Sequence, residues 1–243
     1  MTDPIERIPS GIPRLDAVIE GGFEKNSAIL LSGSGGTGKT IFALQFLMEG
    51  IKSNETGVYI SFEESKEKFY RHMLSFGWDL EDFERKGLFV FIKYEPDKIA
   101  QIVRNRGKDI GESIKSLNAK RIVIDSLSAY TALFEKEADQ RTMLVNLFGM
   151  IESWGCTTIV TAEEDQDPLK YRSSVMGFMA DAIILLYVII KDDKTMTRAL
   201  QVSKMRGTKH LFGIFPFFID QKGIDAYPDQ VLFILKGGKH MKK

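Results

Sequence analysis

The sequence contains one cysteine, no excess of charge of either sign and no long apolar run. Cys156 stands alone in an apolar stretch, so no disulfide can form within the chain, and we expect a buried, reduced thiol. Lys and Arg together number 33, as do Asp and Glu, which excludes a global electrostatic attraction to nucleic acid or to an anionic membrane. This balance still allows a local basic patch.

The sequence also lacks the features of membrane and secreted proteins. Its longest apolar run, residues 182–190, is far shorter than the roughly 20 residues that a membrane-spanning helix needs. No basic segment followed by an apolar one, as in a secretory signal, opens the chain. We therefore expect a soluble, cytoplasmic protein with no membrane partner.

A glycine-rich segment follows the first apolar run of the chain. Residues 33–40 fill the pattern G-x-x-x-x-G-K-[ST], with a strand-like run at 27–32 before them and a helix-compatible segment at 41–51 after them. Glycines let backbone N–H groups surround phosphate oxygens, and the N-terminus of a helix adds partial positive charge. Lys39 is suited to the β- and γ-phosphates of a nucleotide, and the Thr40 hydroxyl to Mg²⁺. The alternative, a glycine-rich turn with an incidental lysine, does not account for the complete pattern in this context.

The chain then alternates strands with helices. After a short packing helix at about 13–20, strands are predicted at 57–62, 88–92, 121–124 and 157–161. Helices are predicted up to about residue 76, in a short piece after the turn at 77–80, once or twice over 98–117, and over about 139–154. This alternation indicates a mostly parallel sheet flanked by helices. A polar segment at 166–174 is expected to form a loop.

Beyond residue 180 the pattern changes. Strands are predicted at 182–190, 198–205, 214–219 and 231–235 without long helices between them, and the first two are joined by a turn at 191–194. This predicts an antiparallel C-terminal extension of the same sheet. The chain has no internal repeat or linker-like tract, so we expect one α/β domain over 1–243. It would comprise a lead-in at 1–26, a nucleotide-binding core at 27–180 and an antiparallel strand tail at 181–243.

Three acids follow predicted parallel strands, at the edge of the sheet where ligand chemistry collects. Asp125 ends a buried run, the arrangement of a Walker B acid that holds Mg²⁺ directly or through water; the other interpretation is a helix N-cap or a turn residue. Glu63 or Glu64 could deprotonate an attacking water as a general base, unless the pair is a solvated acidic turn. Adjacent strand residues face opposite ways, so we expect one direct base and one supporting partner. The residues alone do not say which is which.

Several motifs occur in a fixed order along the chain. They are Ser-Gly-Ile-Pro-Arg-Leu-Asp at 10–16, the glycine-rich loop at 33–40, Phe-Glu-Glu-Ser at 62–65, Ser-Phe-Gly-Trp-Asp-Leu at 75–80, Val-Ile-Asp-Ser at 123–126 and Lys-Met-Arg-Gly-Thr-Lys-His at 204–210. With this set the chain resembles, nearly from end to end, the KaiC-like branch of the RecA superfamily of ATPases. The resemblance implies a RecA-like P-loop NTPase fold. One such module is present here, whereas the cyanobacterial clock protein has two in tandem, so a clock role does not carry over.

The resemblance implies roles for the singled-out residues. Glu63 and Glu64 would be the catalytic pair, and Asp125 the acid on the Mg²⁺ side. It also implies a homo-oligomeric ring, commonly hexameric, with ATP bound between neighbouring subunits. Lys204 and Arg206 would then reach the γ-phosphate of the neighbour's ATP. Positions two apart on a strand share a face, so both cations would point one way and Met205 the other; without the resemblance they would be a solvated basic face.

The resemblance also implies which residues surround the nucleotide. From the glycine-rich loop these are Gly33, Ser34, Gly35, Gly36, Thr37, Gly38, Lys39, Thr40 and Ile41. From the rest of the chain they are Ser75, Lys204, Met205, Arg206, Thr208, His210 and Asp220. His210 and Asp220 would lie nearer the base or the ribose. The relatives carry a hydroxyl residue where this chain has Asp220, and His210 would otherwise be an ordinary polar loop residue.

The leading functional prediction is an ATPase that uses ATP, ADP and Mg²⁺, hydrolyses ATP slowly, and has a regulatory or signalling role through an unidentified protein partner. The alternative is a single-stranded-DNA-binding, recombinase-like protein or an accessory ATPase of recombination or repair. Lys170, Tyr171 and Arg172 could grip a phosphate backbone and stack a base. The zero net charge, the single short basic cluster and the lack of an added helix-hairpin-helix-type domain count against it. A third interpretation is autophosphorylation, but the phosphorylated segment of the clock relative has no persuasive counterpart here.

Overall fold

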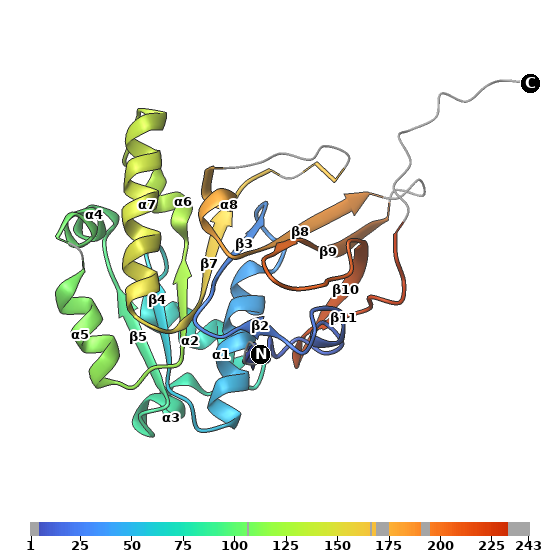
Figure 1. The fold of residues 1–243 in the computed structure, drawn as a ribbon. Helices are drawn as coiled ribbons and strands as arrows, with labels where there is room; N and C mark the ends of the chain where they lie inside the picture. The colour runs from blue at the N-terminus through green and yellow to red at the C-terminus, as the bar shows by residue number, and fades with distance from the viewer. Residues whose placement is uncertain (1–4, 106, 166, 169–174, 191–194, 233–243) are drawn as a thin grey trace, which may run out of the picture.

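One sheet runs through the chain (Figure 1). The computed structural model describes residues 5–105, 107–165, 167–168, 175–190 and 195–232. The parallel strands are β3 (Ala28–Gly33), β4 (Gly57–Ser61), β5 (Phe89–Lys93), β6 (Arg121–Asp125), β7 (Thr157–Glu163) and β8 (Ala182–Ile190). The antiparallel strands are β9 (Met196–Met205), β10 (Ile214–Asp220) and β11 (Gly223–Ala226). Within the described residues these nine strands lie in the order β11-β10-β9-β8-β3-β7-β6-β4-β5.

Helices cover both faces of this sheet (Figure 1). One face packs against α1 (Lys39–Lys52), α2 (Lys66–Leu74) and α3 (Leu80–Arg85). The other packs against α4 (Pro96–Arg104), α5 (Lys108–Ser116), α6 (Leu127–Thr131), α7 (Glu137–Ser153) and α8 (Val175–Met179). Successive side chains of a buried strand point to opposite faces, so Leu31 joins the core under α1 and Leu30 joins the core under α7. The predicted α/β architecture with an antiparallel C-terminal extension is confirmed.

The lead-in differs from the prediction of a helix at 13–20. Over its described residues, 5–26, it contains a 3-10 turn, η1 (Asp16–Val18), and a two-stranded ribbon formed by β1 (Arg7–Ile8) and β2 (Phe23–Glu24). Arg14 and Glu20 have positive φ angles of 66° and 56°, which a right-handed helix does not allow. The Asp16 carboxylate instead accepts a hydrogen bond from the Ser10 backbone N–H, 2.9 Å between the heavy atoms, and so closes a turn.

The C-terminal part also differs. Strand β10 pairs with β9 and also with β11, which was not predicted. A strand was predicted instead at 231–235. Its residues Val231 and Leu232 are not in a strand, and residues 233–235 lie outside the described ones. A tight turn makes the pairing of β10 with β11 possible. The Lys222 N–H donates to the Asp220 carboxylate at 2.7 Å, and Gly223 adopts a φ of 109° that favours glycine.

The remaining predicted elements between residues 39 and 205 are found with small shifts at their ends. Two short helices, α6 and α8, were not predicted, because five residues are too few to show a helical period. The predicted turn at 191–194 and most of the predicted loop at 166–174 lie outside the described residues. Over the part of the chain that is described, no helix combines the length and the apolar character needed to cross a bilayer.

Candidate functional site

The glycine-rich loop connects the end of β3 to the start of α1, as predicted. Gly36 and Gly38 adopt positive φ angles of 76° and 103°, which glycine allows without strain. The Lys39 ammonium folds back over the loop and donates to the Gly33 and Ser34 carbonyl oxygens at 2.8 and 2.9 Å. Burial lowers the pKa of Lys39, while the carboxylates of Glu163, Asp125 and Glu63 oppose this. The N-terminus of α1 and a cation thus meet at one point.

Carboxylates gather at the carboxyl ends of the parallel strands beside this loop. Glu63 follows β4, Asp125 ends β6 and Glu163 ends β7, and all of them act electrostatically on Lys39. Glu163 was not among the predicted site residues. Its carboxylate lies next to the loop. A side chain at Gly35 would meet it, because a Cβ atom built there would lie 3.3 Å from Glu163 Oε1. The signal that could have found it is an acid at the end of a strand beside β3.

The Asp125 carboxylate accepts hydrogen bonds from hydroxyl groups on three elements. Thr40 Oγ1 of α1 donates to Oδ2 at 2.9 Å, and Tyr59 Oη of β4 donates to the same oxygen at 2.5 Å. Thr161 Oγ1 of β7 donates to Oδ1 at 2.5 Å. Burial raises the pKa of the Tyr59 phenol well above its ordinary value, so this group stays protonated and donates at neutral pH. Tyr59 and Thr161 were not predicted.

These oxygen atoms suit a hard divalent cation. Mg²⁺ takes oxygen ligands, usually one or two from the protein, with water and substrate phosphates supplying the rest. Thr40 and Asp125 provide oxygens beside the phosphate loop. No group of three or more His, Cys, Asp or Glu side chains that could enclose a metal occurs among the described residues. The donor set therefore fits Mg²⁺ bound together with a nucleotide.

Glu63 and Glu64 point apart. Glu63 Oε1 accepts a hydrogen bond from Ser126 Oγ at 2.7 Å, next to Asp125. Glu64 Oε1 instead lies 3.1 Å from His72 Nδ1 on α2. Both residues lie in a bend just after β4, outside the strand on which the prediction of opposite faces relied, and the roles of base and supporting partner stay predictions. The Glu63 carboxylate is therefore hydrogen-bonded next to Asp125. Glu64 is bonded through its backbone to Ser61, which pairs with Asp125, and its carboxylate acts on Tyr59 through its charge.

Ser75 and Asp220 belong to different elements. Ser75 follows α2, where its hydroxyl donates to the His72 carbonyl at 2.7 Å. Asp220 ends β10. The turn that follows it lies close to Trp78, which comes shortly after Ser75, because a Cβ atom built on Gly223 would lie 3.1 Å from the Trp78 ring. The residue before Asp220 also touches the phosphate loop, with Ile219 Cδ1 2.9 Å from a Cβ built on Gly38. Among the described residues, no hydrogen bond or ion pair joins the Ser75 or Asp220 side chain to the phosphate loop.

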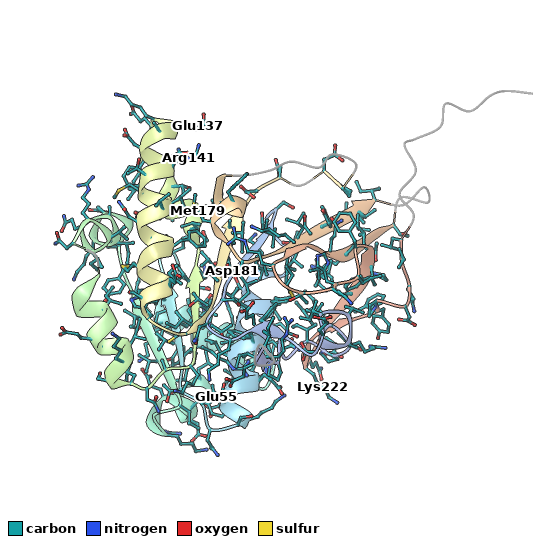
Figure 2. All side chains as sticks on the ribbon, viewed as in Figure 1. Glu55, Glu137, Arg141, Met179, Asp181 and Lys222 are labelled. Atoms are coloured by element: carbon teal, nitrogen blue, oxygen red, sulfur yellow. The ribbon has the colours of Figure 1, made fainter. Side chains whose placement is uncertain are left out.

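Lys204 and Arg206 point to one side and Met205 to the other, as predicted. Met205 is buried in the core under α1. Lys204 Nζ donates to the carbonyl oxygens of Gly177 and Ala180 at 3.0 and 2.7 Å. Arg206 donates to Asp181 Oδ1, a residue labelled in Figure 2, and to a carbonyl oxygen of α8, both at 3.1 Å. Both cations are thus held at the C-terminal end of α8.

The sheet register places these cations far from the phosphate loop of their own chain. Met205 pairs with Ala182, and Ala182 pairs with Ile29 near the start of β3. Gly33, where the phosphate loop begins, pairs with Leu186. The cations therefore lie at the opposite end of β3, which is roughly 13 Å away for a rise of about 3.3 Å per residue.

Thr208 lies beside the cations, where its hydroxyl donates to the Arg206 carbonyl oxygen at 3.2 Å. Thr208 Oγ1 accepts a hydrogen bond from Arg7 Nη1 at 2.7 Å, which joins it to the lead-in. His210 Nδ1 is buried without a hydrogen-bond partner among the described residues. The loop residues thus form one group with Glu63 and Asp125, and Lys204, Arg206 and Thr208 form another. No contact assigns Ser75, His210 or Asp220 to either group within the described residues.

A further cation does reach the loop from within the chain. Arg198, at the start of β9, donates from Nε to the Gly36 carbonyl oxygen at 3.2 Å. It was not predicted, because nothing in the sequence shows that β9 starts beside the loop. Lys170, Tyr171 and Arg172, the candidate DNA contacts, lie outside the described residues.

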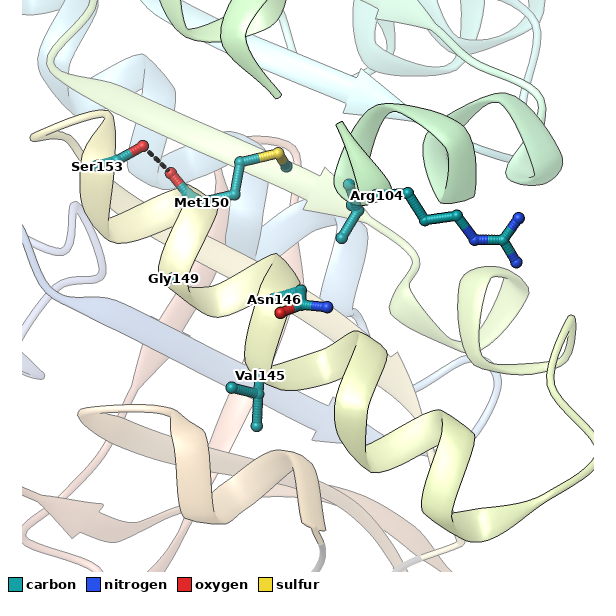
Figure 3. Close-up of a pocket in the computed structure, with 7 residues that line it drawn as sticks. Arg104, Val145, Asn146, Gly149, Met150 and Ser153 are labelled. Atoms are coloured by element: carbon teal, nitrogen blue, oxygen red, sulfur yellow. Dashed lines mark hydrogen bonds between the residues drawn. The ribbon is translucent and has the colours of Figure 1, made fainter. Parts of the chain in front are cut away.

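A groove between α4 and α7 lies away from these residues (Figure 3). Its lining includes Arg104, Val145, Asn146, Gly149 and Met150. It contains none of the predicted site residues.

Known proteins resemble this chain over most of its length. A sequence model of a protein family, described as "ATPase: KaiC", matches residues 8–231. A UPF0273 protein of Pyrococcus horikoshii is 34% identical over 239 residues, which cover 93% of this chain and 96% of that protein. The circadian clock protein KaiC3 of Synechocystis is 35% identical over 236 residues, which cover 93% of this chain but 46% of the clock protein.

The fold is also found in a solved structure. The crystal structure of a KaiC-like protein from Pyrococcus horikoshii superposes with a TM-score of 0.81 at 36% identity, covering 93% of this chain and 100% of that one. This confirms the predicted RecA-like P-loop fold. The phosphate loop, the strand-end carboxylates and the end-to-end match lead to one conclusion: the chain belongs to the KaiC family of ATPases.

Proposed function

We propose that this chain is a Mg²⁺-dependent ATPase that binds ATP between neighbouring subunits of a ring, hexameric as is common in the family. The observation that carries the proposal is the position of Lys204 and Arg206 at the opposite end of β3 from their own phosphate loop. Cations placed there contribute to phosphoryl transfer only if a second subunit presents its ATP to them. An arginine supplied in this way neutralises charge that develops on the transferred group.

The loop residues would bind the phosphates. The backbone N–H groups of 33–40 and the N-terminus of α1 attract the phosphate oxygens. Lys39, whose ammonium group now donates to the Gly33 and Ser34 carbonyls, would exchange these weak partners for the β- and γ-phosphates. Arg198 would hold the loop in place through its hydrogen bond to the Gly36 carbonyl oxygen.

Thr40 and Asp125 would hold Mg²⁺, which neutralises phosphate charge when it is bound. Glu63 would orient the attacking water and accept its proton, because its carboxylate lies beside Ser126 and Asp125. Glu64, paired with His72, would hold the turn after β4 in place. The acid side and the cation side of the reaction then belong to different subunits.

The slow turnover and the regulatory role rest on family membership. Similar proteins are named as circadian clock proteins, and each is about twice as long as this chain. In our proposal residues 1–243 form one cytoplasmic ATPase domain whose nucleotide state controls the shape of the ring, or its contact with a protein partner. The fold alone does not determine the process that such an ATPase serves.

The test is ATP binding and assembly measured on the same protein. Calorimetric titration should show Mg²⁺-ATP binding to the parent, and light scattering should show a ring in the presence of the nucleotide. Lys39→Ala should lose most of the binding, because it removes the charge that neutralises the phosphates. Lys52→Ala, at the exposed end of the same helix, is the matched control and should bind as the parent does. A parent that binds no ATP, or stays a monomer with ATP and Mg²⁺, would contradict the proposal.

A further inference from the structure

The Asp125 carboxylate accepts hydrogen bonds from both strands that flank β6. Tyr59 comes from β4 on one side and Thr161 from β7 on the other. Both side chains are buried, with 1% and 0% of their surfaces exposed. The register explains the arrangement, because Tyr59 pairs with Val123 and the residue before Thr161 pairs with Ile124. Side chains two apart on a strand share a face, so these hydroxyls and Asp125 meet on the face covered by α1.

The hydrogen bonds occupy most of the carboxylate. An ionised carboxylate has about four acceptor positions on its two oxygens. Tyr59 and Thr40 donate to Oδ2 and Thr161 donates to Oδ1, which leaves roughly one position open. A hydroxyl group has one hydrogen, and the hydrogen of Thr40 is committed to Asp125. The lone pairs of Thr40 Oγ1 are therefore available to a cation.

We propose that Tyr59 and Thr161 are positioning residues for the Mg²⁺ site. They fix the Asp125 carboxylate in the orientation in which it accepts the hydrogen bond from Thr40 Oγ1, so that the lone pairs of that oxygen would be left to bind Mg²⁺. The inference rests on the proposed function, because it requires Mg²⁺ to bind with the nucleotide at Thr40 and Asp125. Partners that orient metal-binding groups in this way are commonly worth about 10- to 100-fold in metal affinity.

The Tyr59 hydroxyl can be removed without removing the ring. The ring packs against Phe69 and Phe91, with centroids 4.4 and 5.8 Å away. Tyr59→Phe keeps these contacts and deletes only the donor to Asp125. Thr161 allows a matched pair, because Thr161→Val deletes the hydroxyl whereas Thr161→Ser keeps it.

The experiment measures ADP affinity with excess EDTA and with saturating Mg²⁺, and takes the ratio as the Mg²⁺ enhancement. We expect Tyr59→Phe and Thr161→Val to reduce this enhancement by about 10-fold. ADP affinity in EDTA should not change, and Thr161→Ser should resemble the parent. Tyr187→Phe is the control, because Tyr187 is also buried and its hydroxyl donates to Gln201 on β9 at 2.7 Å and not to Asp125.

The possible results distinguish a failure of the positioning role from a failure of the proposed function. If the parent shows the enhancement and Tyr59→Phe and Thr161→Val retain it, the positioning role is wrong and the proposed function stands. If both variants weaken ADP binding equally with and without Mg²⁺, their hydroxyls serve the fold and the inference also fails. If the parent shows no enhancement, the Mg²⁺ site fails and the inference with it. Should Tyr59→Phe not fold, the Thr161 pair decides by itself.

Discussion

Glu63 accepts a hydrogen bond from the Ser126 hydroxyl, with 2.7 Å between the two oxygens, and this contact ties the end of β4 to the end of β6. It places one of two adjacent acids beside Asp125. The other, Glu64, is bound to His72 of α2 instead. Glu63 and Glu64 are therefore two neighbouring carboxylates with different partners, and their substitutions can be compared directly.

We expect Glu63→Gln to bind ATP as the parent does and to hydrolyse it more slowly by about two orders of magnitude or more, because the amide cannot accept the proton of the attacking water. Glu64→Gln is the matched control and should retain most of the activity, since its partner is His72. Phosphate release and calorimetric ATP binding measure the two quantities. A larger loss of hydrolysis in Glu64→Gln than in Glu63→Gln would reverse the assignment.

A second prediction concerns alkaline pH and the lone cysteine. Burial raises the pKa of the Cys156 thiol from about 9 to about 11. Well below pH 9 the thiol is protonated in both the folded and the unfolded chain, so the full stabilisation from the raised pKa is present. Between pH 9 and 11 the unfolded chain loses the proton first. The parent should therefore lose up to about 1.4 kcal/mol of unfolding free energy per pH unit relative to Cys156→Ala.

Urea unfolding at pH 8 and pH 10 measures this difference. The buried tyrosines also titrate at high pH, but they are present in both proteins and their effect cancels. Equal losses in the parent and in Cys156→Ala would mean that the thiol is open to solvent in the folded chain.

The phosphate loop could be predicted because its information is local. A strand, a glycine-rich turn and a helix follow one another directly, so the pattern at 33–40 also specifies its surroundings. The acids Glu63 and Asp125 could be predicted because each follows a strand, and parallel strands end at the same edge of the sheet. Their convergence required no knowledge of the register.

Tyr59 and Thr161 could not be predicted, because each lies inside a strand that reads as core. Their contact with Asp125 depends on which strands neighbour β6 and in which register, and the sequence pattern shows neither. The strand predicted at 231–235 is not found at Val231 and Leu232, its described residues, for a related reason. That run has the apolar composition of a strand, whereas β11 at Gly223–Ala226 contains Gly and Asp, which are rare in strands. Its pairing is determined by the turn after Asp220.

A third prediction addresses the DNA-binding alternative, which rests on Lys170, Tyr171 and Arg172. We expect weak binding to single-stranded DNA, with a Kd no tighter than about 10⁻⁶ M at physiological salt, as for non-specific contacts. Fluorescence anisotropy over a range of salt concentrations measures it, with Lys170→Ala/Arg172→Ala as the comparison. Tight binding that requires ATP and disappears in the double variant would make DNA binding the main function.

The last prediction concerns the boundary between subunits. Arg206→Ala should leave ATP bound through Lys39 but lower hydrolysis, by at most the three to five orders of magnitude that an arginine finger supplies. Its contacts with Asp181 and α8 are exposed, so the fold should survive the change. Arg141→Ala, an exposed arginine on α7, is the control and should remain active.

Mixing two inactive variants decides whether the cations act across the boundary. One variant lacks the acids, Glu63→Gln/Glu64→Gln, and the other lacks the cations, Lys204→Ala/Arg206→Ala. In a mixed ring, some interfaces join the intact acids of the Lys204→Ala/Arg206→Ala variant to the intact cations of the Glu63→Gln/Glu64→Gln variant. ATP hydrolysis should therefore return. The register supports this outcome, because the two groups lie at opposite ends of β3 within one chain. If subunits exchange and activity does not return, the cations act within their own chain or take no part in hydrolysis.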